Sequence, residues 1–255
     1  MKKAYFISDI HLGARYNEET RAVERSVVRF LDNIKHQAAE LYLLGDILDY
    51  WFEYRHVVPK GFVRFFGKLA ELADSGVKIT WLIGNHDIWI FDYIPQELGV
   101  NVVDGILERE IMGVRFSLQH GDAIGGNFKF RLLRKLFRNR FCQKLYGGIH
   151  PRWTVGFAFA CSRRSRMKKR VVDEWPNNLI QRIREWCALR IREGDMAEYF
   201  VFGHLHSLYD ESLPEGKHLI VVPDWPGTLT YGIFDGHDFK FEKFDAGVSV
   251  PASNS

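Results

Sequence analysis

Short apolar runs alternate with amphipathic stretches over the first hundred residues, and this alternation is what most limits the folds open to the chain. The runs Ala4–Ser8, Leu41–Leu44 and Lys78–Ile83 have the length and apolarity of buried strands. Between them, Glu19–Gln37 and Gly61–Asp74 carry apolar side chains at helical spacing. A strand–helix–strand–helix–strand order implies parallel strands joined by right-handed crossovers, which places the chain in the α/β class.

Beyond Pro95 the pattern predicts shorter and more frequent strands, with a group of helices between them. The predicted strands are Val100–Val103, Gly105–Ile111, Val114–Gln119, Glu198–Phe202, His218–Val222, Thr228–Phe234 and Phe239–Phe244. The predicted helices are Asn127–Tyr146, Arg152–Lys169 and Asn177–Arg192. No repeat or linker divides the 255 residues, so we expect one domain over residues 1–255 with a helical insertion at about residues 127–193. The small, polar end at residues 247–255 is predicted to be disordered.

Polar blocks rich in Asp, His and Asn follow five of the predicted strands. The blocks are Asp9-Ile10-His11, Gly45-Asp46-Ile47-Leu48-Asp49, Gly84-Asn85-His86-Asp87, His120-Gly121-Asp122 and Gly203-His204-Leu205-His206. Open α/β folds bind their ligands beyond the carboxyl ends of the strands, where these blocks lie. Each block alone could be a turn, a helix cap or a pair of solvated side chains. Five together are hard to explain by folding needs, because adjacent His and Asp side chains carry a desolvation and repulsion cost that a metal would offset.

The chemistry of these side chains indicates which metals they would hold. Oxygen and nitrogen donors without a thiolate suit Mn²⁺, Fe, Co²⁺ or Zn²⁺. The candidate ligands are Asp9, His11, Asp46, Asn85, His120, His204 and His206. They are too many for one tetrahedral ion, whereas two divalent ions that share a bridging carboxylate fit their number.

The order of the blocks resembles the calcineurin-like metallophosphoesterase superfamily, whose pattern is Asp-x-His, Gly-Asp, Gly-Asn-His-Asp/Glu, His and Gly-His-x-His. The resemblance implies a four-layer α/β/β/α sandwich and a two-metal hydrolase of phosphate esters. It implies one ion held by Asp9, His11, Asp46 and His206, and a second held by Asp46, Asn85, His120 and His204. It also implies that His86 stabilises the transition state or protonates the leaving oxygen, and that Asp87 orients the imidazole of His86.

One segment of the chain is strongly basic, whereas the rest is acidic. No Asp or Glu occurs between Asp122 and Asp173, and the stretch from Phe128 to Arg170 contains 14 Lys or Arg residues. The remaining chain has a net charge of −11, although the formal net charge of the whole chain is +3. Aromatic residues are interleaved with these cations, and on a helix residues 128–141 form an apolar face with basic flanks. Such a helix suits packing on the core with a solvated basic face, an anionic membrane surface or single-stranded nucleic acid.

The insertion directly follows the block that contains His120, so we expect it to form a lid over the metal site. An apolar and basic lid over a phosphate-cleaving centre looks like the UDP-2,3-diacylglucosamine pyrophosphatases of lipid A biosynthesis, which also carry a Trp soon after Gly-Asp, here Trp51. This resemblance implies hydrolysis of the diphosphate of UDP-2,3-diacylglucosamine to UMP and 2,3-diacylglucosamine 1-phosphate, with Mn²⁺ as the usual ion. It implies substrate contacts at Asn85, His86, Ser162, Arg166 and Lys169.

The chain departs from the best-studied branch of that family at two places. That branch has Arg where this chain has His86, and an acidic pair where this chain has Gly125-Gly126-Asn127. Two other functions therefore stay open on the sequence. A nuclease or cyclic-nucleotide diesterase would use the same metal ligands on another phosphate ester. A metal-loaded binding scaffold without turnover is the third, although a scaffold has no need of an acid such as His86 beside the metals.

The sequence also predicts where the protein works. The first apolar run ends at Ser8-Asp9, too early for a signal peptide, and no run approaches the ~20 apolar residues of a membrane span. The three Cys residues form no Cys-x-x-Cys pair, which is typical of reduced thiols in the cytosol. We therefore expect a cytoplasmic enzyme that associates peripherally with the inner membrane and acts on a phosphorylated glycolipid rather than on nucleic acid.

Overall fold

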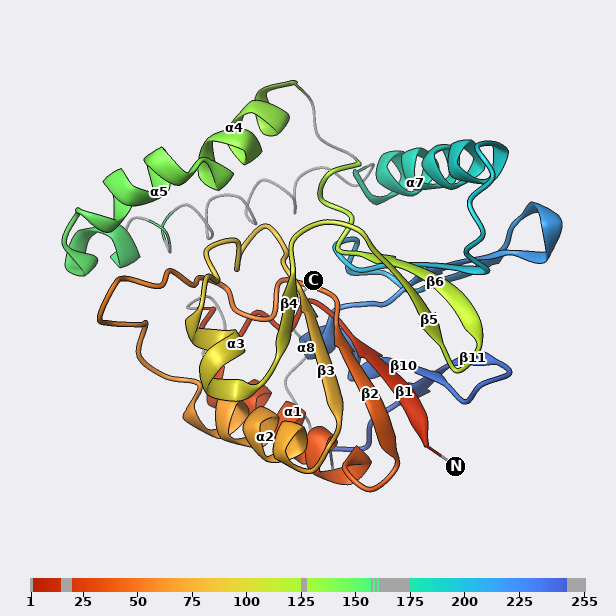
Figure 1. Cartoon of the computed structure of the whole chain (residues 1–255), viewed down its shortest axis with the longest axis horizontal. Coiled ribbons are helices and arrows are strands. Elements are labelled where there is room, and N and C mark those ends of the chain that lie inside the picture. Colours follow the sequence, from red (N-terminus) through yellow and green to blue (C-terminus); the bar gives the residue numbers. More distant parts are fainter. Residues whose placement is uncertain are drawn as a thin grey trace.

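The computed structural model of the chain describes residues 2–14, 20–124, 128–156, 158, 160 and 175–246. Two β-sheets pack face to face, and helices cover their outer faces (Figure 1). The predicted α/β/β/α order of layers is confirmed. The end predicted to be disordered, residues 247–255, lies outside the described residues.

The first sheet has its strands in the order β11-β10-β1-β2-β3-β4. These strands are β1 (Lys3–Ile7), β2 (Ala38–Leu43), β3 (Lys78–Leu82), β4 (Asn101–Val103), β10 (Thr230–Phe234) and β11 (Phe239–Lys243). β1 to β4 are parallel, as the alternation of strands and helices predicts. β10 runs antiparallel to β1, and β11 antiparallel to β10, so the last strands of the chain extend the sheet beside its first strand.

The second sheet has the order β5-β6-β7-β9-β8. Its strands are β5 (Leu107–Ile111), β6 (Val114–Gln119), β7 (Tyr199–Phe202), β8 (Tyr209–Ser212) and β9 (His218–Val221). β6, β7 and β9 are parallel, and β5 and β8 form antiparallel edges. The sequence pattern does not predict β8, because its residues are mostly polar and its side chains stay partly or fully exposed.

Successive residues of the central strands face opposite layers, which creates separate cores on the two sides of each sheet. In β1, Tyr5 packs towards the outer helices, whereas Phe6 packs between the two sheets. The helices on the first sheet are α1 (Thr20–Ile34) and α2 (Val63–Asp74). On the second sheet, α7 (Trp175–Arg192) contributes the apolar face that packs against β7 and β9. The central strands β1, β2, β3, β7 and β9 are thereby largely buried on both faces.

The basic segment forms two helices where the periodicity predicts one over Asn127–Tyr146. α4 (Phe128–Arg138) and α5 (Arg140–Gly147) are separated at Asn139. The side-chain oxygen of Asn139 accepts hydrogen bonds from two backbone N–H groups of α5, so this residue starts a new helix. A further helical stretch covers residues 151–156, and most of the predicted helix Arg152–Lys169 lies outside the described residues.

Besides β8, three short elements are absent from the sequence-based prediction. They are α3 (Tyr93–Leu98), the 3₁₀ turn η1 (Pro214–Gly216) and α8 (Trp225–Thr228). The buried carboxylate of Glu53 accepts hydrogen bonds of 2.7–3.1 Å from the backbone N–H groups of Phe91, Asp92 and Tyr93 at the start of α3. A cap from about 40 residues away leaves no signal in the local sequence.

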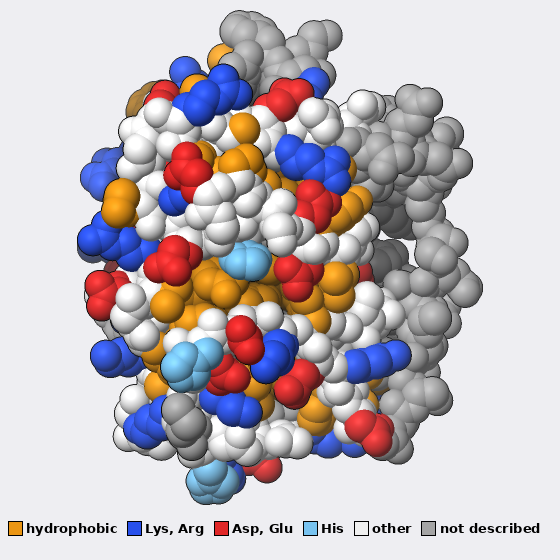
Figure 2. Space-filling view, turned by 90° about the vertical axis from the view of Figure 1, so that its right-hand side faces the viewer, with side chains coloured by type: hydrophobic (Ala, Val, Ile, Leu, Met, Phe, Trp, Pro, Cys, Tyr) orange, Lys and Arg blue, Asp and Glu red, His pale blue; other side chains and the backbone are white. Residues whose placement is uncertain are grey.

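Charge is mixed on the face that looks to the right in Figure 1. There, Lys and Arg side chains are interspersed with Asp and Glu around a central apolar area (Figure 2). This face differs from the segment between Asp122 and Asp173, which contains no acidic residue at all. Among the described residues, no helix has both the length and the apolarity that crossing a membrane requires.

Candidate metal centre

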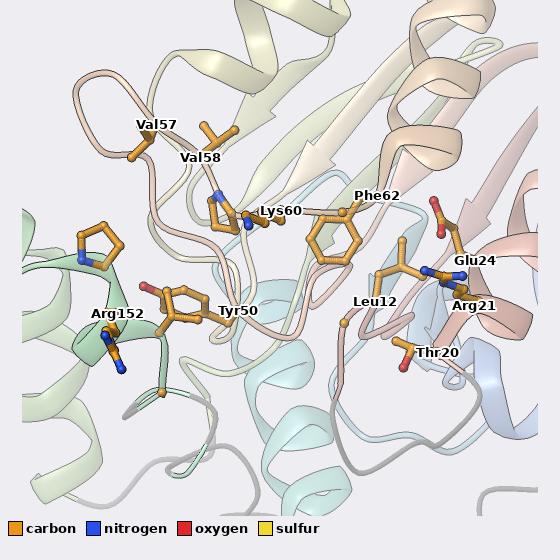
Figure 3. Close-up of a pocket in the computed structure, with 16 residues that line it drawn as sticks. Leu12, Thr20, Arg21, Glu24, Tyr50, Val57, Val58, Lys60, Phe62 and Arg152 are labelled. Atoms are coloured by element: carbon orange, nitrogen blue, oxygen red, sulfur yellow. The ribbon is translucent and has the colours of Figure 1, made fainter.

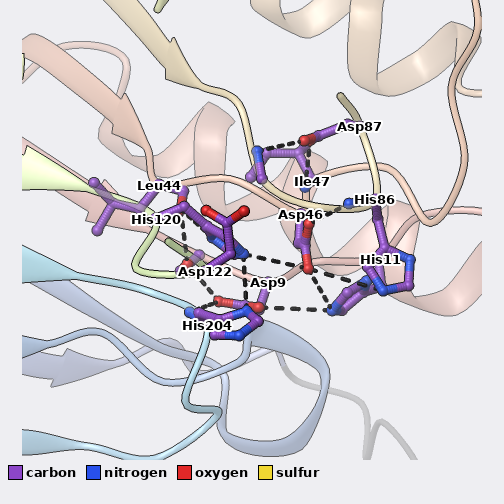
Figure 4. A network of polar contacts seen from close by, with 12 residues as sticks. Asp9, His11, Leu44, Asp46, Ile47, His86, Asp87, His120, Asp122 and His204 are labelled. Carbon is purple, nitrogen blue, oxygen red and sulfur yellow. Dashed lines mark hydrogen bonds and ion pairs between the residues drawn. The ribbon is translucent and has the colours of Figure 1, made fainter. Parts of the chain in front are cut away.

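The five polar blocks lie in loops that leave β1, β2, β3, β6 and β7 at their carboxyl ends, and the fold brings these loops together (Figure 4). Three groups of Asp and His side chains each place their ligand atoms within 4.8 Å of one another. The groups are Asp9, His11 and His206; His11, Asp46 and His86; and Asp46, His120 and His204. Every Asp and His among the predicted ligands is a member of at least one group.

Asp9 lies at the end of β1 with its carboxylate between two imidazoles. Its Oδ1 is 3.1 Å from Nε2 of His206 and 3.6 Å from Nε2 of His11. Its Oδ2 accepts hydrogen bonds from Oγ of Ser8 at 2.5 Å and from the backbone N–H of His204 at 2.9 Å. The carboxylate is therefore held by one oxygen, and the other oxygen faces the two rings.

Asp46 occupies the centre of the cluster, where one oxygen meets imidazoles from three different blocks. Its Oδ2 is 3.4 Å from Nε2 of His120, 3.9 Å from Nε2 of His11 and 4.0 Å from Nε2 of His86. Its Oδ1 accepts a hydrogen bond of 2.8 Å from the backbone N–H of His86. This is the placement that a carboxylate shared by two ions needs.

His120 and His204 form the side of the cluster nearest the second sheet. Nδ1 of His120 lies 2.8 Å from the carbonyl oxygen of Leu44, an arrangement in which this nitrogen carries the proton and Nε2 keeps its lone pair. Nε2 of His120 is 3.1 Å from Nδ1 of His204, close enough for both nitrogens to bind one ion. The Oδ1 atom of Asn85 is buried and accepts no hydrogen bond from the described residues. Coordination of a cation would satisfy that amide oxygen.

The hydrogen bonds of Asp87 differ from the predicted role, which was to orient the His86 ring. Its carboxylate accepts from the backbone N–H groups of Ile47 and Gly84 and from Nε1 of Trp81, at 2.7–3.0 Å. Asp87 therefore ties the loop after β3 to the loop after β2. A short carboxylate at this position turns back onto the adjacent backbone, as Asp side chains commonly do in turns.

Asp49 is the carboxylate that lies beside Nδ1 of the His86 ring. Sequence reasoning placed Asp49 in the block after β2 but assigned it no role. Its Oδ1 is 3.5 Å from Nδ1 of His86, and its backbone oxygen is 3.0 Å from the same nitrogen. The same Oδ1 is 3.6 Å from Nδ1 of His11. The signal that could have found it is its position three residues after Asp46, on the same strand-end loop.

Five of the seven predicted ligands have a left-handed backbone, which residues other than Gly rarely adopt. Their φ angles are 50° at Asp9, 49° at His11, 53° at Asp46, 67° at His204 and 57° at His206. Each such residue costs on the order of 1 kcal/mol or more. Strain of this kind persists only where the surrounding structure enforces it, and it concentrates at functional sites.

Two motif glycines allow these side chains to approach each other. At Gly45, where φ is +91°, a Cβ atom would lie 2.6 Å from Nδ1 and 2.7 Å from Cγ of His120. At Gly203, a Cβ atom would lie 3.0 Å from Oδ2 of Asp9. The glycines of the Gly-Asp and Gly-His-x-His blocks therefore make room for a ligand, in addition to shaping a turn.

The electrostatics of the cluster depend on its buried carboxylates. Burial acts to raise the pKa of Asp9, but the imidazoles of His206 and His11 hold this pKa well below its usual value. Burial likewise opposes ionisation of Asp46, whose pKa is held well below the usual value by His120 and its neighbours. For His120, burial lowers the pKa and the charge of Asp46 raises it, with a net value of about 10. These carboxylates thus need positive charge beside them, and a divalent cation supplies it while leaving the imidazoles neutral.

The residues fit divalent metal ions. The donors are carboxylate, imidazole and amide groups without thiolate, and Asn85 offers a buried oxygen without another partner among the described residues. His86 also lies in a group with His11 and Asp46, so its ring borders the metal site, although it was predicted as a non-ligand. The structure therefore brings together the six Asp and His residues of the predicted ligand sets, and Asn85 lies next to His86 on the loop after β3.

α4 and α5 dock on the loops of the metal centre through aromatic side chains. Nε1 of Trp89 donates a 2.9 Å hydrogen bond to the carbonyl oxygen of Phe137 on α4. The ring of Tyr146 on α5 lies 4.7 Å from that of Trp89 and 4.8 Å from that of Phe52, measured between centroids. One face of the basic segment therefore packs on the core. The predicted substrate contacts Ser162, Arg166 and Lys169 lie outside the described residues.

Comparison with known proteins agrees with this site. The model of the family described as calcineurin-like phosphoesterase matches residues 2–208, a range that contains all five polar blocks. A Porphyromonas gingivalis protein named UDP-2,3-diacylglucosamine hydrolase is 39% identical over 95% of this chain and 98% of its own length. A Neisseria meningitidis protein of the same name is 28% identical over 88% of this chain and 90% of its own length.

Proposed function

The chain belongs to the calcineurin-like phosphoesterase family, and from this premise we propose that it hydrolyses the diphosphate of UDP-2,3-diacylglucosamine to UMP and 2,3-diacylglucosamine 1-phosphate. The observation that carries the proposal is the cluster around Asp46, where one carboxylate oxygen faces imidazoles from three strand-end loops. The substrate is taken from relatives of that name, which match this chain over nearly their whole length. Residues 1–255 form one domain in this proposal, with a helical insertion at about residues 127–193. Within the insertion, α4 and α5 form the lid, whereas α7 packs on the second sheet.

Two groups of residues would hold the ions. Asp9, His11, Asp46 and His206 would hold one ion, and Asp46, Asn85, His120 and His204 would hold the other. The geometry supports this division, because Asp9, His11 and His206 form one close group and Asp46, His120 and His204 another. Mn²⁺ is the proposed ion, since mixed oxygen and nitrogen donors suit it.

Divalent ions held by these residues would lower the pKa of bound water and would neutralise charge on phosphoryl oxygens. His86 provides the proton in the proposed reaction. Its Nδ1 is held at 3.0 Å from the carbonyl oxygen of Asp49, which leaves Nε2 directed at the centre, 4.0 Å from Oδ2 of Asp46. Water adds to phosphorus and releases one proton to the solvent, and the diphosphate P–O bond breaks. His86, which has taken up a proton from the solvent at Nε2, passes that proton to the leaving phosphate oxygen.

A cavity of about 810 Å³ starts beside the metal centre and offers space for an acyl chain. Leu12 and Gly13, directly after the ligand His11, line one part of it. Figure 3 shows Tyr50 and Arg152 on one side of the cavity and Leu12 and Phe62 on the other, with Val58 above them. The remaining lining residues are Thr20, Arg21, Glu24, Val57, Pro59, Lys60, Gly61, Pro151, Val155 and Gly156. The apolar walls and the three basic side chains, Arg21, Lys60 and Arg152, suit an acylated phosphosugar.

The outer side of the lid suits an anionic membrane surface. Phe141, Leu145, Ile149 and Trp153 follow one another at a spacing of four residues and are 67%, 59%, 44% and 70% exposed. No acidic residue lies in the surrounding segment, in which Arg140, Lys144 and Arg152 directly precede Phe141, Leu145 and Trp153 in the sequence. Apolar side chains flanked by cations are the pattern of helices that lie in the interface of an anionic bilayer. These exposed apolar residues therefore support peripheral association with the inner membrane.

The reaction is tested by following UMP release from detergent-solubilised UDP-2,3-diacylglucosamine after chelation and after return of Mn²⁺. We expect activity that requires the metal and that Asp46→Ala abolishes, while Asp32→Ala, an exposed change on α1, leaves it intact. Full activity of Asp46→Ala would contradict the assignment of the bridging ligand. Cleavage of single-stranded DNA at a rate matching that of the glycolipid would contradict the substrate.

The membrane surface is tested by sedimentation with vesicles that contain anionic or only zwitterionic lipid. The double variant Phe141→Ser/Trp153→Ser should lose binding to anionic vesicles, whereas Val63→Ser, a change of a 77% exposed side chain on α2, should not. Equal binding of the wild type to both kinds of vesicle would contradict a role of the basic residues in membrane binding.

The cavity is tested with Val58→Trp, which should raise KM for the acylated substrate and leave the hydrolysis of a small chromogenic diester unchanged.

A further inference from the structure

A second cavity, of about 600 Å³, lies beside the metal centre on the side of His120. His120 and Asp122 line it, whereas the cavity proposed for an acyl chain lies next to the ligand His11. In the cluster, His120 and His11 lie on opposite sides of the central Asp46 (Figure 4). The two cavities share no lining residue in the described part of the chain. A substrate whose diphosphate lies on the metal centre can therefore extend into both cavities, with one part on each side.

Apolar side chains from α7 and from the loop between β4 and β5 line this second cavity. Trp186 and Leu189 contribute the apolar surface of α7, and Ile106 contributes that of the loop. Ligand sites in proteins are commonly concavities of about 300–1,000 Å³ with apolar walls and a few polar groups. The cavity therefore has the size and the walls of a site for a flat ring or a sugar.

Gln119 gives the cavity a polar group that the described residues leave without a partner. It is the last residue of β6 and is 4% exposed. Because Leu118 before it packs between the two sheets, Gln119 faces the opposite side, towards α7. Its Nε2 atom is buried and makes no hydrogen bond to the described residues. Buried polar groups are rarely left unpaired, so this amide is placed to donate to an acceptor on a ligand.

Charged side chains line the cavity as well. Nε of Arg134 on α4 donates a hydrogen bond of 2.8 Å to Oδ2 of the buried Asp122, two residues after the ligand His120. This bond holds the guanidinium near the metal centre, and guanidinium groups bind phosphate oxygens. Glu185 on α7 lines the same cavity, and carboxylates commonly accept hydrogen bonds from ribose hydroxyl groups. Together with Gln119, these groups match the phosphate, the sugar and the base of a nucleotide.

We propose that this cavity binds the nucleoside part of the substrate, with Gln119 as the residue that recognises the base. The identity of the base as uracil rests on the proposed function. Uracil has two carbonyl oxygens with one N–H between them, and a primary amide can donate to one oxygen and accept from that N–H. An acyl chain in the same place would leave the buried amide of Gln119 unpaired.

The contribution of the base is measured by calorimetric titration of the Mn²⁺-loaded protein with UMP and with ribose 5-phosphate, which lacks the base. The ratio of the two dissociation constants isolates the effect of uracil. We expect the wild type to bind UMP at least about tenfold more tightly than ribose 5-phosphate, the effect of one or two well-formed hydrogen bonds.

Variants of Gln119 test the recognition of the base. Gln119→Leu and the isosteric Gln119→Glu both remove the N–H donor, and each should lower the ratio by about tenfold. Ser117→Ala is the matched control, because Ser117 is also buried on β6 and points to the same side but does not line the cavity. Ser117→Ala should keep the ratio of the wild type.

A second variant tests the cavity without touching the interior of the protein. Leu189 is 50% exposed, so Leu189→Trp should fold and should weaken the binding of UMP by filling the cavity. Met196→Trp is its control, because Met196 is 64% exposed and does not line the cavity. If neither variant of Gln119 folds, as judged by near-UV circular dichroism, Leu189→Trp carries the test.

The proposal is overturned if the wild type binds UMP no more tightly than ribose 5-phosphate, or if the folded Gln119 variants keep the ratio of the wild type. It is also overturned if Leu189→Trp binds UMP as the wild type does. A lower KM of Gln119→Leu for the glycolipid would overturn it too, since the cavity would then hold an acyl chain.

The proposed function can fail separately from the nucleoside site. A wild type that binds UMP through its base but does not cleave UDP-2,3-diacylglucosamine would refute the proposed substrate and support the site. A wild type that cleaves the glycolipid but binds UMP and ribose 5-phosphate equally well would refute the site alone.

Discussion

Replacing Gly45 with Ala would test whether the glycine of the Gly-Asp block is needed to leave space for the His120 ring. The new Cβ would lie 2.6 Å from Nδ1 and 2.7 Å from Cγ of His120. Carbon atoms in ordinary contact are 3.4–4 Å apart, so the ring has to move by about 0.7 Å. Metal–ligand distances tolerate about ±0.2 Å, and the hydrogen bond from His120 to Leu44 would be strained as well.

The expected magnitudes have two separable parts. Ala at a φ of +91° costs about 1–2 kcal/mol for the backbone alone. Overpacking against His120 adds about 1–3 kcal/mol. Gly76→Ala supplies the matched control, because Gly76 has a φ of +93° and its Cβ would meet nothing within 4 Å. The two variants share the backbone cost and differ in the contact with His120.

Urea unfolding of the apoproteins and calorimetric titration with Mn²⁺ provide the measurements. Gly45→Ala should be less stable than Gly76→Ala by about 1–3 kcal/mol and should bind metal at least about tenfold more weakly. Gly76→Ala should lose stability but bind metal as the wild type does. Equal stability and equal metal affinity of the two variants would refute the reasoning, because Gly45 would then serve only the turn.

Three other outcomes follow from the structure. Trp89→Ala should lower the free energy of unfolding in urea by about 3–5 kcal/mol and speed proteolysis within the lid, because the Trp89 ring packs against Phe137 and Tyr146. Unchanged proteolysis would contradict the docking of α4 and α5 on Trp89. Arg184 holds the pKa of Glu211 below its ordinary 4.5, so this pair stabilises the fold above that pH and loses its effect as the pH falls through the lowered pKa. Glu211→Gln should therefore cost about 0.5 kcal/mol at pH 7 and progressively less as the pH falls through the lowered pKa. Chelation should lower the melting temperature, and Mn²⁺ at 100 times its Kd should restore about 2.7 kcal/mol.

The parts of the fold that the sequence predicts are those whose local pattern is strong. The alternation that ends at Lys78–Ile83 predicts β1, α1, β2, α2 and β3 to within a few residues, because buried strands and amphipathic helices have distinct periods. The break at Asn139 could also be anticipated, since Asn is a common helix cap. By contrast, α3 depends on the distant cap from Glu53, and β8 forms only because β9 offers an edge.

The residues of the site also fall into those that the sequence could predict and those that it could not. The side chains directly beyond the strand ends could be predicted, because parallel strands bring their carboxyl ends to one edge of a sheet. The roles of Asp49 and Asp87 could not. They depend on how the loop after β2 packs against the loop after β3. In this packing Asp49 contacts the His86 ring, whereas Asp87 accepts hydrogen bonds from the backbone.

The left-handed backbone at five of the predicted ligands links metal supply to the amount of folded protein. At about 1 kcal/mol each, these conformations together cost on the order of 5 kcal/mol, which is comparable with the whole net stability of a domain. Bound ions offset this cost by mass action, so the apoprotein lies nearer to the unfolding threshold than the loaded enzyme. In a cell short of the metal, quality control would remove the idle enzyme, and its abundance would follow the ion that it needs.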